Sequence, residues 1–276
     1  MVDTQVGAMM RQLAELRSPT GGFGPVAAVV PNEGAAPGQQ VMGIGGAIGG
    51  GGAGTWSLAF RSMLEGILRD GEDMAIGIPY AMVRKSFQRL GYVLEAVKVP
   101  RLVVVDGGGD ANVLVDSVSS GTMVGSITAK EGEGDLAVTG LHDWSSCIFG
   151  DPLIMAVFSD RPSDSLLKGF NGSDINLGDA GPGVVGLRLS RDAIDDVAGV
   201  GVRLLFYQMY HALVSVVKEF YRPRVDSSKR EMEARKKLNE ALVKLAGIPD
   251  DIRKMHRRPS GEMSPAKRLK QGEEGA

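Results

Sequence analysis

The chain has 276 residues, of which 43% are hydrophobic and 23% charged, a composition typical of a globular protein with a sizeable core. The formal net charge of −2 gives no electrostatic reason to expect a nucleic-acid partner. The single cysteine, Cys147, excludes an internal disulfide, and no apolar run approaches the roughly 20 residues of a membrane span. The N-terminus shows no secretion signal. We therefore expect a cytoplasmic protein without a membrane partner.

Helical spacing of apolar residues dominates the first hundred residues. The pattern predicts helices over Thr4–Leu16 and Trp56–Leu68, and a third helix that Pro79 opens and that continues to Val97. Between the first two helices, residues 31–54 are so rich in glycine that ordering them costs much backbone entropy. We interpret residues 31–54 as a flexible insertion.

Short apolar runs rich in β-branched residues follow in the middle of the chain. They predict buried strands over residues 102–105, 113–115 and 137–141. Three strands between groups of helices are too few for a doubly wound sheet. The pattern predicts an α+β protein that is mainly helical and has a small sheet.

The last third returns to helical patterns. Apolar positions predict a helix over Val202–Phe220, and Ser228 with Glu231 forms a capping box that opens another helix, ending at Gly247. We place the boundary of this domain, residues 1–250, just beyond that helix. The pattern disappears in residues 251–276, which we expect to be a disordered basic tail.

The tail carries two clusters of basic residues. The second contains Lys267, Arg268 and Lys270, and such a cluster is read by nuclear import receptors or is simply a solvated charged segment. The first interpretation adds a nuclear location to the cytoplasmic one. Both interpretations remain open.

Two polar motifs lie at the ends of predicted strands. Asp106 follows the first strand, Asn112 precedes the second, and Asp143 follows the third within His142-Asp143-Trp144. A carboxylate held at a strand end suits a magnesium ion that is bound to phosphate. The alternative is that residues 106–112 are an ordinary glycine-rich turn, in which Asp and Asn are common.

These motifs resemble the aminoglycoside phosphotransferase family, which includes choline kinases and is related to protein kinases. The family's catalytic loop has an Asp and an Asn before an apolar strand. Its metal motif reads Ile-Asp-Trp, which is similar to residues 141–144. A stretch like Phe149-Gly-Asp-Pro after this motif is also common in the family. The downstream helices resemble the fungal branch. The resemblance implies the larger lobe of a kinase-like fold, with Asp106 as the catalytic base, Asn112 and Asp143 as magnesium ligands, and ATP as the phosphoryl donor.

The chain also departs from the family pattern. Asp106 and Asn112 are six positions apart where the family has five, and the histidine of the loop is absent. The resemblance extends from Val6 to Ala246 and leaves out the family's N-terminal small lobe. Two functions therefore stay open: ATP-dependent phosphoryl transfer to the hydroxyl of an unidentified small molecule, or an inactive, truncated relative that serves as a binding protein.

Overall fold

The computed structural model describes residues 2–30, 51–107, 112–117, 136–174, 177–179 and 187–249. Within these residues the protein is α+β, with long helices and small antiparallel sheets, as the sequence predicted. The basic tail and most of the glycine-rich insertion lie outside the described residues. The last residues of the predicted insertion are described, and Ala53 forms an antiparallel bridge with Phe23.

The helical spacing in the sequence located the long helices. The α-helices are α1 (Val2–Glu15), α2 (Val26–Val29), α3 (Trp56–Asp73), α4 (Tyr80–Leu90), α5 (Ala156–Ser159), α6 (Asp164–Asn171), α7 (Val200–Tyr221) and α8 (Ser227–Ala246). The 3₁₀ turns that lie wholly within the described residues are η1 (Gly91–Ala96), η3 (Pro152–Ile154) and η4 (Val197–Gly199). The expected capping box of α8 is wrong. The helix begins at Ser227, and Asp226 precedes it with a φ of 69° and no side-chain cap.

The strands form three separate antiparallel sheets in the described residues. They are β1 (Gly24–Pro25), β2 (Arg101–Val104), β3 (Val113–Ser117), β4 (Leu136–Leu141), β5 (Cys147–Gly150), β6 (Leu177–Asp179) and β7 (Arg188–Ser190). One sheet has the order β1-β5-β2, and the others are the pairs β3-β4 and β6-β7. The three predicted strands are therefore present, but the first does not pair with the other two; it pairs with β5.

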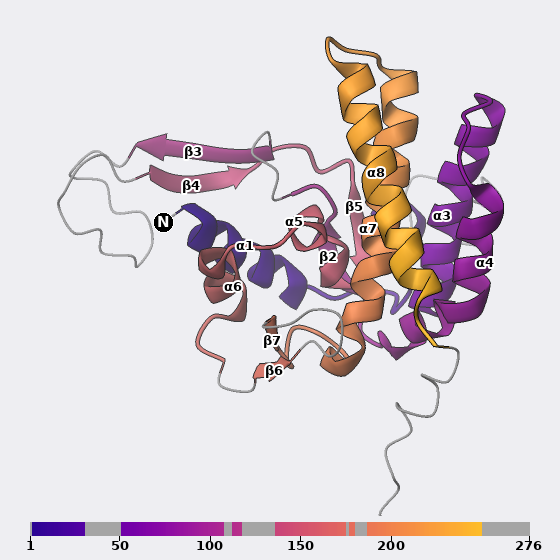
Figure 1. Ribbon diagram of the computed structural model, residues 1–276. Coiled ribbons are helices and arrows are strands. Elements are labelled where there is room, and N and C mark those ends of the chain that lie inside the picture. The colour runs from indigo at the N-terminus through magenta and orange to yellow at the C-terminus, as the bar shows by residue number, and fades with distance from the viewer. Residues whose placement is uncertain are drawn as a thin grey trace, which may run out of the picture.

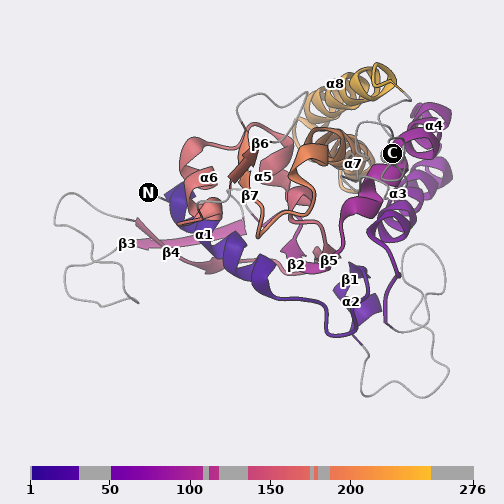
Figure 2. The ribbon, with the colours of Figure 1, turned by 90° about the horizontal axis from the view of Figure 1, so that it is seen from below.

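The small β1-β5-β2 sheet lies between two groups of helices. The pair α7 and α8 runs antiparallel beside α3 and α4 on one side, while α1 and α6 lie on the other (Figure 1). Seen from below, β2 and β5 occupy the centre between these groups (Figure 2). This sheet therefore holds together the parts of the molecule that carry the candidate residues.

Helices α1 and α6 approach each other closely because each has a glycine at the crossing. A Cβ atom on Gly7 would lie 2.2 Å from the carbonyl oxygen of Leu166, and one on Gly169 would lie 2.0 Å from that of Thr4. Neither distance is sterically allowed. Glycine at both positions is thus a requirement of this helix packing.

Helix α7 is the central helix of the core. Residues 197–221 are long and apolar enough, by length and composition, to cross a membrane, which the sequence analysis did not find. In the structure 61% of that apolar window is buried inside the protein, and α7 packs against α3, α5 and α8. Such burial is typical of the core helix of a globular protein.

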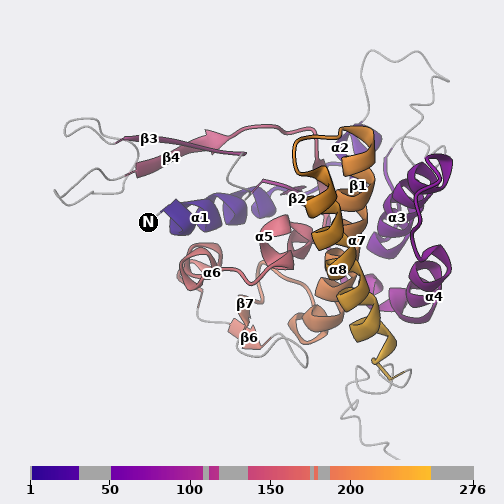
Figure 3. The ribbon, with the colours of Figure 1, turned by 45° about the horizontal axis from the view of Figure 1, so that its top comes forward.

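The β3-β4 hairpin extends from this body and lies over α1 (Figure 3). The side chain of Gln5 joins them: its Oε1 accepts a 2.6 Å hydrogen bond from the Val138 backbone N–H, and its Nε2 donates to the Leu136 carbonyl at 3.5 Å. Gln5 therefore fixes the hairpin to the helix. The end of the hairpin nearer the sheet carries Asn112 and His142.

Candidate functional site

The three residues selected from the sequence lie at neighbouring strand ends. The Asn112 amide Nδ2 donates a 2.9 Å hydrogen bond to the main-chain carbonyl of Asp106. The backbone N–H of His142 donates to the Asn112 carbonyl at 2.8 Å, and Asp143 follows directly. The structure therefore connects the segments around Asp106, Asn112 and Asp143, although residues 108–111 of the loop between the first two lie outside the described residues.

Asp106 is half-buried, and two hydrogen bonds fix the backbone of the residue before it. The preceding residue, Val105, donates its N–H to the Ser146 carbonyl at 3.3 Å, and its own carbonyl accepts the N–H of Ala156 at 2.7 Å. The Ser146 hydroxyl also donates to the Asp106 carboxylate oxygen Oδ1. Ser146 thus orients the carboxylate that the sequence singled out. Sequence reasoning missed Ser146, because only the pairing of β2 with β5 brings it there.

Asp143 is an exposed carboxylate in a strained turn. Its φ of 55° lies in the left-handed region, which Asp tolerates better than most residues. Its Oδ1 accepts the backbone N–H of Ser145 at 2.9 Å. Hydrogen bonds from Ser145, with smaller contributions from the charges of His142 and Lys218, lower the pKa of Asp143. The carboxylate therefore stays ionised at neutral pH.

The carboxylates of Asp106 and Asp143 both influence the thiol of Cys147. Burial is the main reason why the pKa of the Cys147 thiol is raised, and the two carboxylates raise it further. Cys147 therefore remains a neutral thiol, and both carboxylates lie close enough to influence it.

The described residues contain no cluster of three His, Cys, Asp or Glu side chains that could hold a metal ion. Magnesium does not require such a cluster, since it keeps several water ligands and is usually bound by one or two carboxylates together with substrate phosphates. Asp143 offers a carboxylate, and the Asn112 amide keeps its Oδ1 as an acceptor while Nδ2 is engaged. These two residues fit a magnesium–phosphate complex better than a metal site made of protein ligands alone.

A groove of about 2720 Å³ extends from Asp106 along α7, and its walls include residues of α5, α8 and the start of β5. It exceeds the ~300–1000 Å³ of a typical small-molecule site, so a single ligand would occupy only part of it. Of the predicted residues, Asp106 lines the groove, whereas Asn112 and Asp143 are not among its lining residues. The polar side chains of the lining include Asp106, Ser145, Ser146, His211, Ser215 and Lys218.

His211 is held by a backbone contact in this groove. Its Nε2 lies 2.6 Å from the Ile154 carbonyl oxygen, which can only accept, so this nitrogen carries the proton. Burial lowers the pKa of His211, which favours the neutral ring. His211 therefore supplies neither a positive charge nor a free Nε2 base to the groove.

Asp151, the acid of the Phe149-Gly-Asp-Pro stretch, has a structural role. Its side chain is 1% exposed, accepts the Tyr207 hydroxyl at 2.7 Å and lies 3.1 Å from the Arg203 guanidinium Nε. It also caps η3 through the Leu153 N–H at 3.2 Å. The Phe149-Gly-Asp-Pro stretch thus anchors β5 to α7 rather than contributing to the groove.

Comparisons of this chain with protein-family models, with curated proteins and with solved structures found no match. The geometry and chemistry of the site are therefore the basis for any functional assignment.

Proposed function

We propose that this chain is the larger lobe of an aminoglycoside-phosphotransferase-like protein and that its site transfers the γ-phosphoryl group of ATP to a small-molecule hydroxyl. One observation carries the proposal. Asp106, Asn112 and Asp143 come from three separate strand ends, hydrogen bonds connect those ends, and Asp106 lines a groove. Such convergence is expected of a functional site and is unnecessary for a glycine-rich turn.

Each residue has a role that suits its environment. Asp106, oriented by Ser146 at the groove, would accept the proton of the attacking hydroxyl. Asp143 and the Oδ1 of Asn112 would hold magnesium, which supplies positive charge to the phosphates as the reaction proceeds. The ionised state of Asp143 supports its part, because a metal ligand must be deprotonated.

The alternative is a binding protein that keeps the ligand site and has lost catalysis. Two observations favour it: the loop from Asp106 to Asn112 is one position longer than in the family it resembles, and the Asp106 carboxylate is already engaged by the Ser146 hydroxyl. Phosphoryl transfer depends almost entirely on positioning and charge stabilisation, so a displaced base reduces turnover strongly.

Calorimetry with ATP, in the presence and absence of magnesium, tests the ligand site. We expect magnesium-dependent binding that Asp143→Ala weakens at least tenfold. Asp116→Ala is the matched control, because Asp116 is an exposed carboxylate on β3 whose one hydrogen bond within the described part of the chain is from the N–H of its neighbour Ser117. Equal affinity in the wild type and in Asp143→Ala would contradict the proposal.

Turnover then separates the enzyme from the binding protein. The chain is incubated with magnesium-ATP and a panel of amino alcohols and aminoglycosides, and phosphorylated product is measured. If the chain is an enzyme, we expect Asp106→Asn to lower the rate of product formation about 10²–10⁴-fold while ATP affinity is retained. Binding without any product above background would support the alternative.

A further inference from the structure

Helix α7 is mostly apolar, but it carries one polar stripe along the groove. Gln208, His211, Ser215 and Lys218 are spaced at i, i+3, i+7 and i+10, so they lie on one face of the helix, and all four line the groove. The two halves of this stripe differ in their burial and in their partners.

The first half of the stripe is used by the fold. Gln208 Nε2 donates to the Ser159 carbonyl at 2.9 Å, and His211 Nε2 donates to the Ile154 carbonyl at 2.6 Å. These bonds attach the η3–α5 segment to α7. Both side chains are therefore occupied.

The second half of the stripe is not used in this way. Among the described residues, Ser215 has no side-chain hydrogen bond and Lys218 has no ion pair within 4.0 Å, and both are exposed to the groove. Two donors thus line the same groove as Asp106, Ser145 and Ser146.

We infer that Lys218 and Ser215 bind the phosphate chain of the nucleotide, with the Lys218 ammonium as the cation of the site. This inference rests on the proposed function and identifies how the chain would hold a polyphosphate. A lysine ammonium is a compact charge that suits phosphate oxygens, and a serine hydroxyl adds a donor. His211 cannot serve as this cation, because it is neutral and its Nε2 is engaged.

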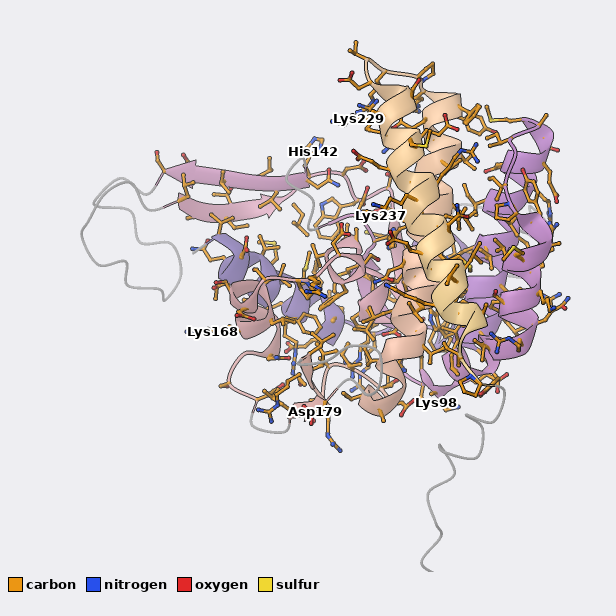
Figure 4. The ribbon with its side chains drawn as sticks, in the orientation of Figure 1. Lys98, His142, Lys168, Asp179, Lys229 and Lys237 are labelled. Carbon is orange, nitrogen blue, oxygen red and sulfur yellow. The ribbon has the colours of Figure 1, made fainter. Side chains whose placement is uncertain are left out.

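Calorimetry with three probes in the presence of magnesium tests the inference: tripolyphosphate, ATP and adenosine. We expect Lys218→Gln to weaken the binding of tripolyphosphate and of ATP at least tenfold and to leave any adenosine binding unchanged. Lys218→Arg keeps the charge and should stay within a few-fold of the wild type. Lys168→Gln is the control, since Lys168 is an exposed lysine on α6, away from α7 and α8 (Figure 4).

The outcomes separate this inference from the proposed function. Magnesium-ATP binding that depends on Asp143 but is unchanged in Lys218→Gln would overturn the inference alone. Binding of tripolyphosphate that depends on Lys218, without any dependence on Asp143, would support the phosphate site and contradict the magnesium site. A wild-type chain that binds no polyphosphate would overturn the inference outright. Thermal denaturation of each variant verifies that Lys218→Gln folds, as expected for an exposed side chain.

Discussion

At the scale of single residues, Tyr207 connects two buried polar groups at the centre of the protein. The Trp56 indole N–H donates to the Tyr207 hydroxyl at 2.8 Å, and this hydroxyl donates to Asp151 at 2.7 Å. In Tyr207→Phe the indole loses its acceptor and Asp151 loses a donor. We expect the free energy of unfolding, measured by urea denaturation, to fall by about 1–3 kcal/mol, because a buried polar group without a partner costs that much.

The control for this prediction is the same substitution at Tyr221, whose side chain is 57% exposed at the end of α7. Water replaces any contact of an exposed hydroxyl, so Tyr221→Phe should change stability by no more than about 0.5 kcal/mol. Equal effects of the two substitutions would mean that the hydroxyl of Tyr207 adds nothing to the buried network.

At the scale of elements, Glu219 joins the two helices of the α7–α8 hairpin. It accepts hydrogen bonds from Arg230 at 2.8 and 3.0 Å and from the Ser227 hydroxyl at 2.6 Å. These bonds, Arg230 first, lower the pKa of Glu219 from 4.5 to about 2. A carboxylate with a lowered pKa stabilises the fold above its unfolded-state pKa, and this contribution is lost as the pH falls from about 4.5 through about 2.

Thermal denaturation across this pH range tests the role of Glu219. We expect Glu219→Gln to melt below the wild type at neutral pH and the difference to shrink steadily as the pH falls below about 4.5. Glu233→Gln is the control, because Glu233 is exposed on α8. A difference that stays constant with pH would exclude the ionised form of Glu219 as its source.

Helix α8 packs on the protein through its buried face. Matched substitutions at Leu238 and Val243 test this packing. Leu238 is 1% exposed and Val243 is 69% exposed. A carboxylate at position 238 has no water and no buried partner, so Leu238→Asp should cost at least about 3 kcal/mol of unfolding free energy. Val243→Asp should cost no more than about 0.5 kcal/mol in the same urea titration. Equal losses would show that α8 does not pack through this face.

The elements also differ in how far the sequence predicts them. The long helices were predictable because burial of one face imposes a helical period, as in α8, where Leu238 is buried. The four-residue strand β5 and the three-residue strands β6 and β7 have no such signal, since they are too short to show a period. The start of α8 was misplaced because the residue before the helix, Asp226, adopts a left-handed backbone conformation without a side-chain cap, which the Ser-x-x-Glu pattern does not indicate.

The residues of the candidate site could be predicted only where they lie next to the ends of predicted strands. The proximity of Asn112 and Asp143 follows from the apolar runs beside them, which pair as β3 and β4. Asp106 follows β2, which pairs with β5 instead, and the Asn112 side chain joins it to the other two. Ser146 and Lys218 were not predictable, because one reaches the site through the β2-β5 pairing and the other through the packing of α7. Both depend on contacts between residues far apart in the sequence.

At the scale of the whole molecule, Arg101 ties together three separate parts of the fold. It lies at the start of β2 with 7% of its surface exposed, and its guanidinium donates to the Ala14 carbonyl in α1 at 3.0 Å and to the Asp192 carbonyl after β7 at 2.7 Å. Burial lowers the pKa of Arg101, yet an arginine remains charged at neutral pH. The end of α1 and the segment after β7 are thus both held by one buried guanidinium group of the central sheet.

Substitution of Arg101 by lysine tests whether these ties stabilise the whole fold. A single ammonium cannot reproduce the two diverging donors of a guanidinium, so one of the two carbonyls would lose its partner. We expect Arg101→Lys to reduce the free energy of unfolding by about 1–3 kcal/mol in urea. Arg17→Lys is the control, because Arg17 faces Arg101 across an isolated β-bridge but is exposed. If both variants unfold at the same urea concentration as the wild type, the contacts of Arg101 do not stabilise the connection between α1, β2 and the segment after β7.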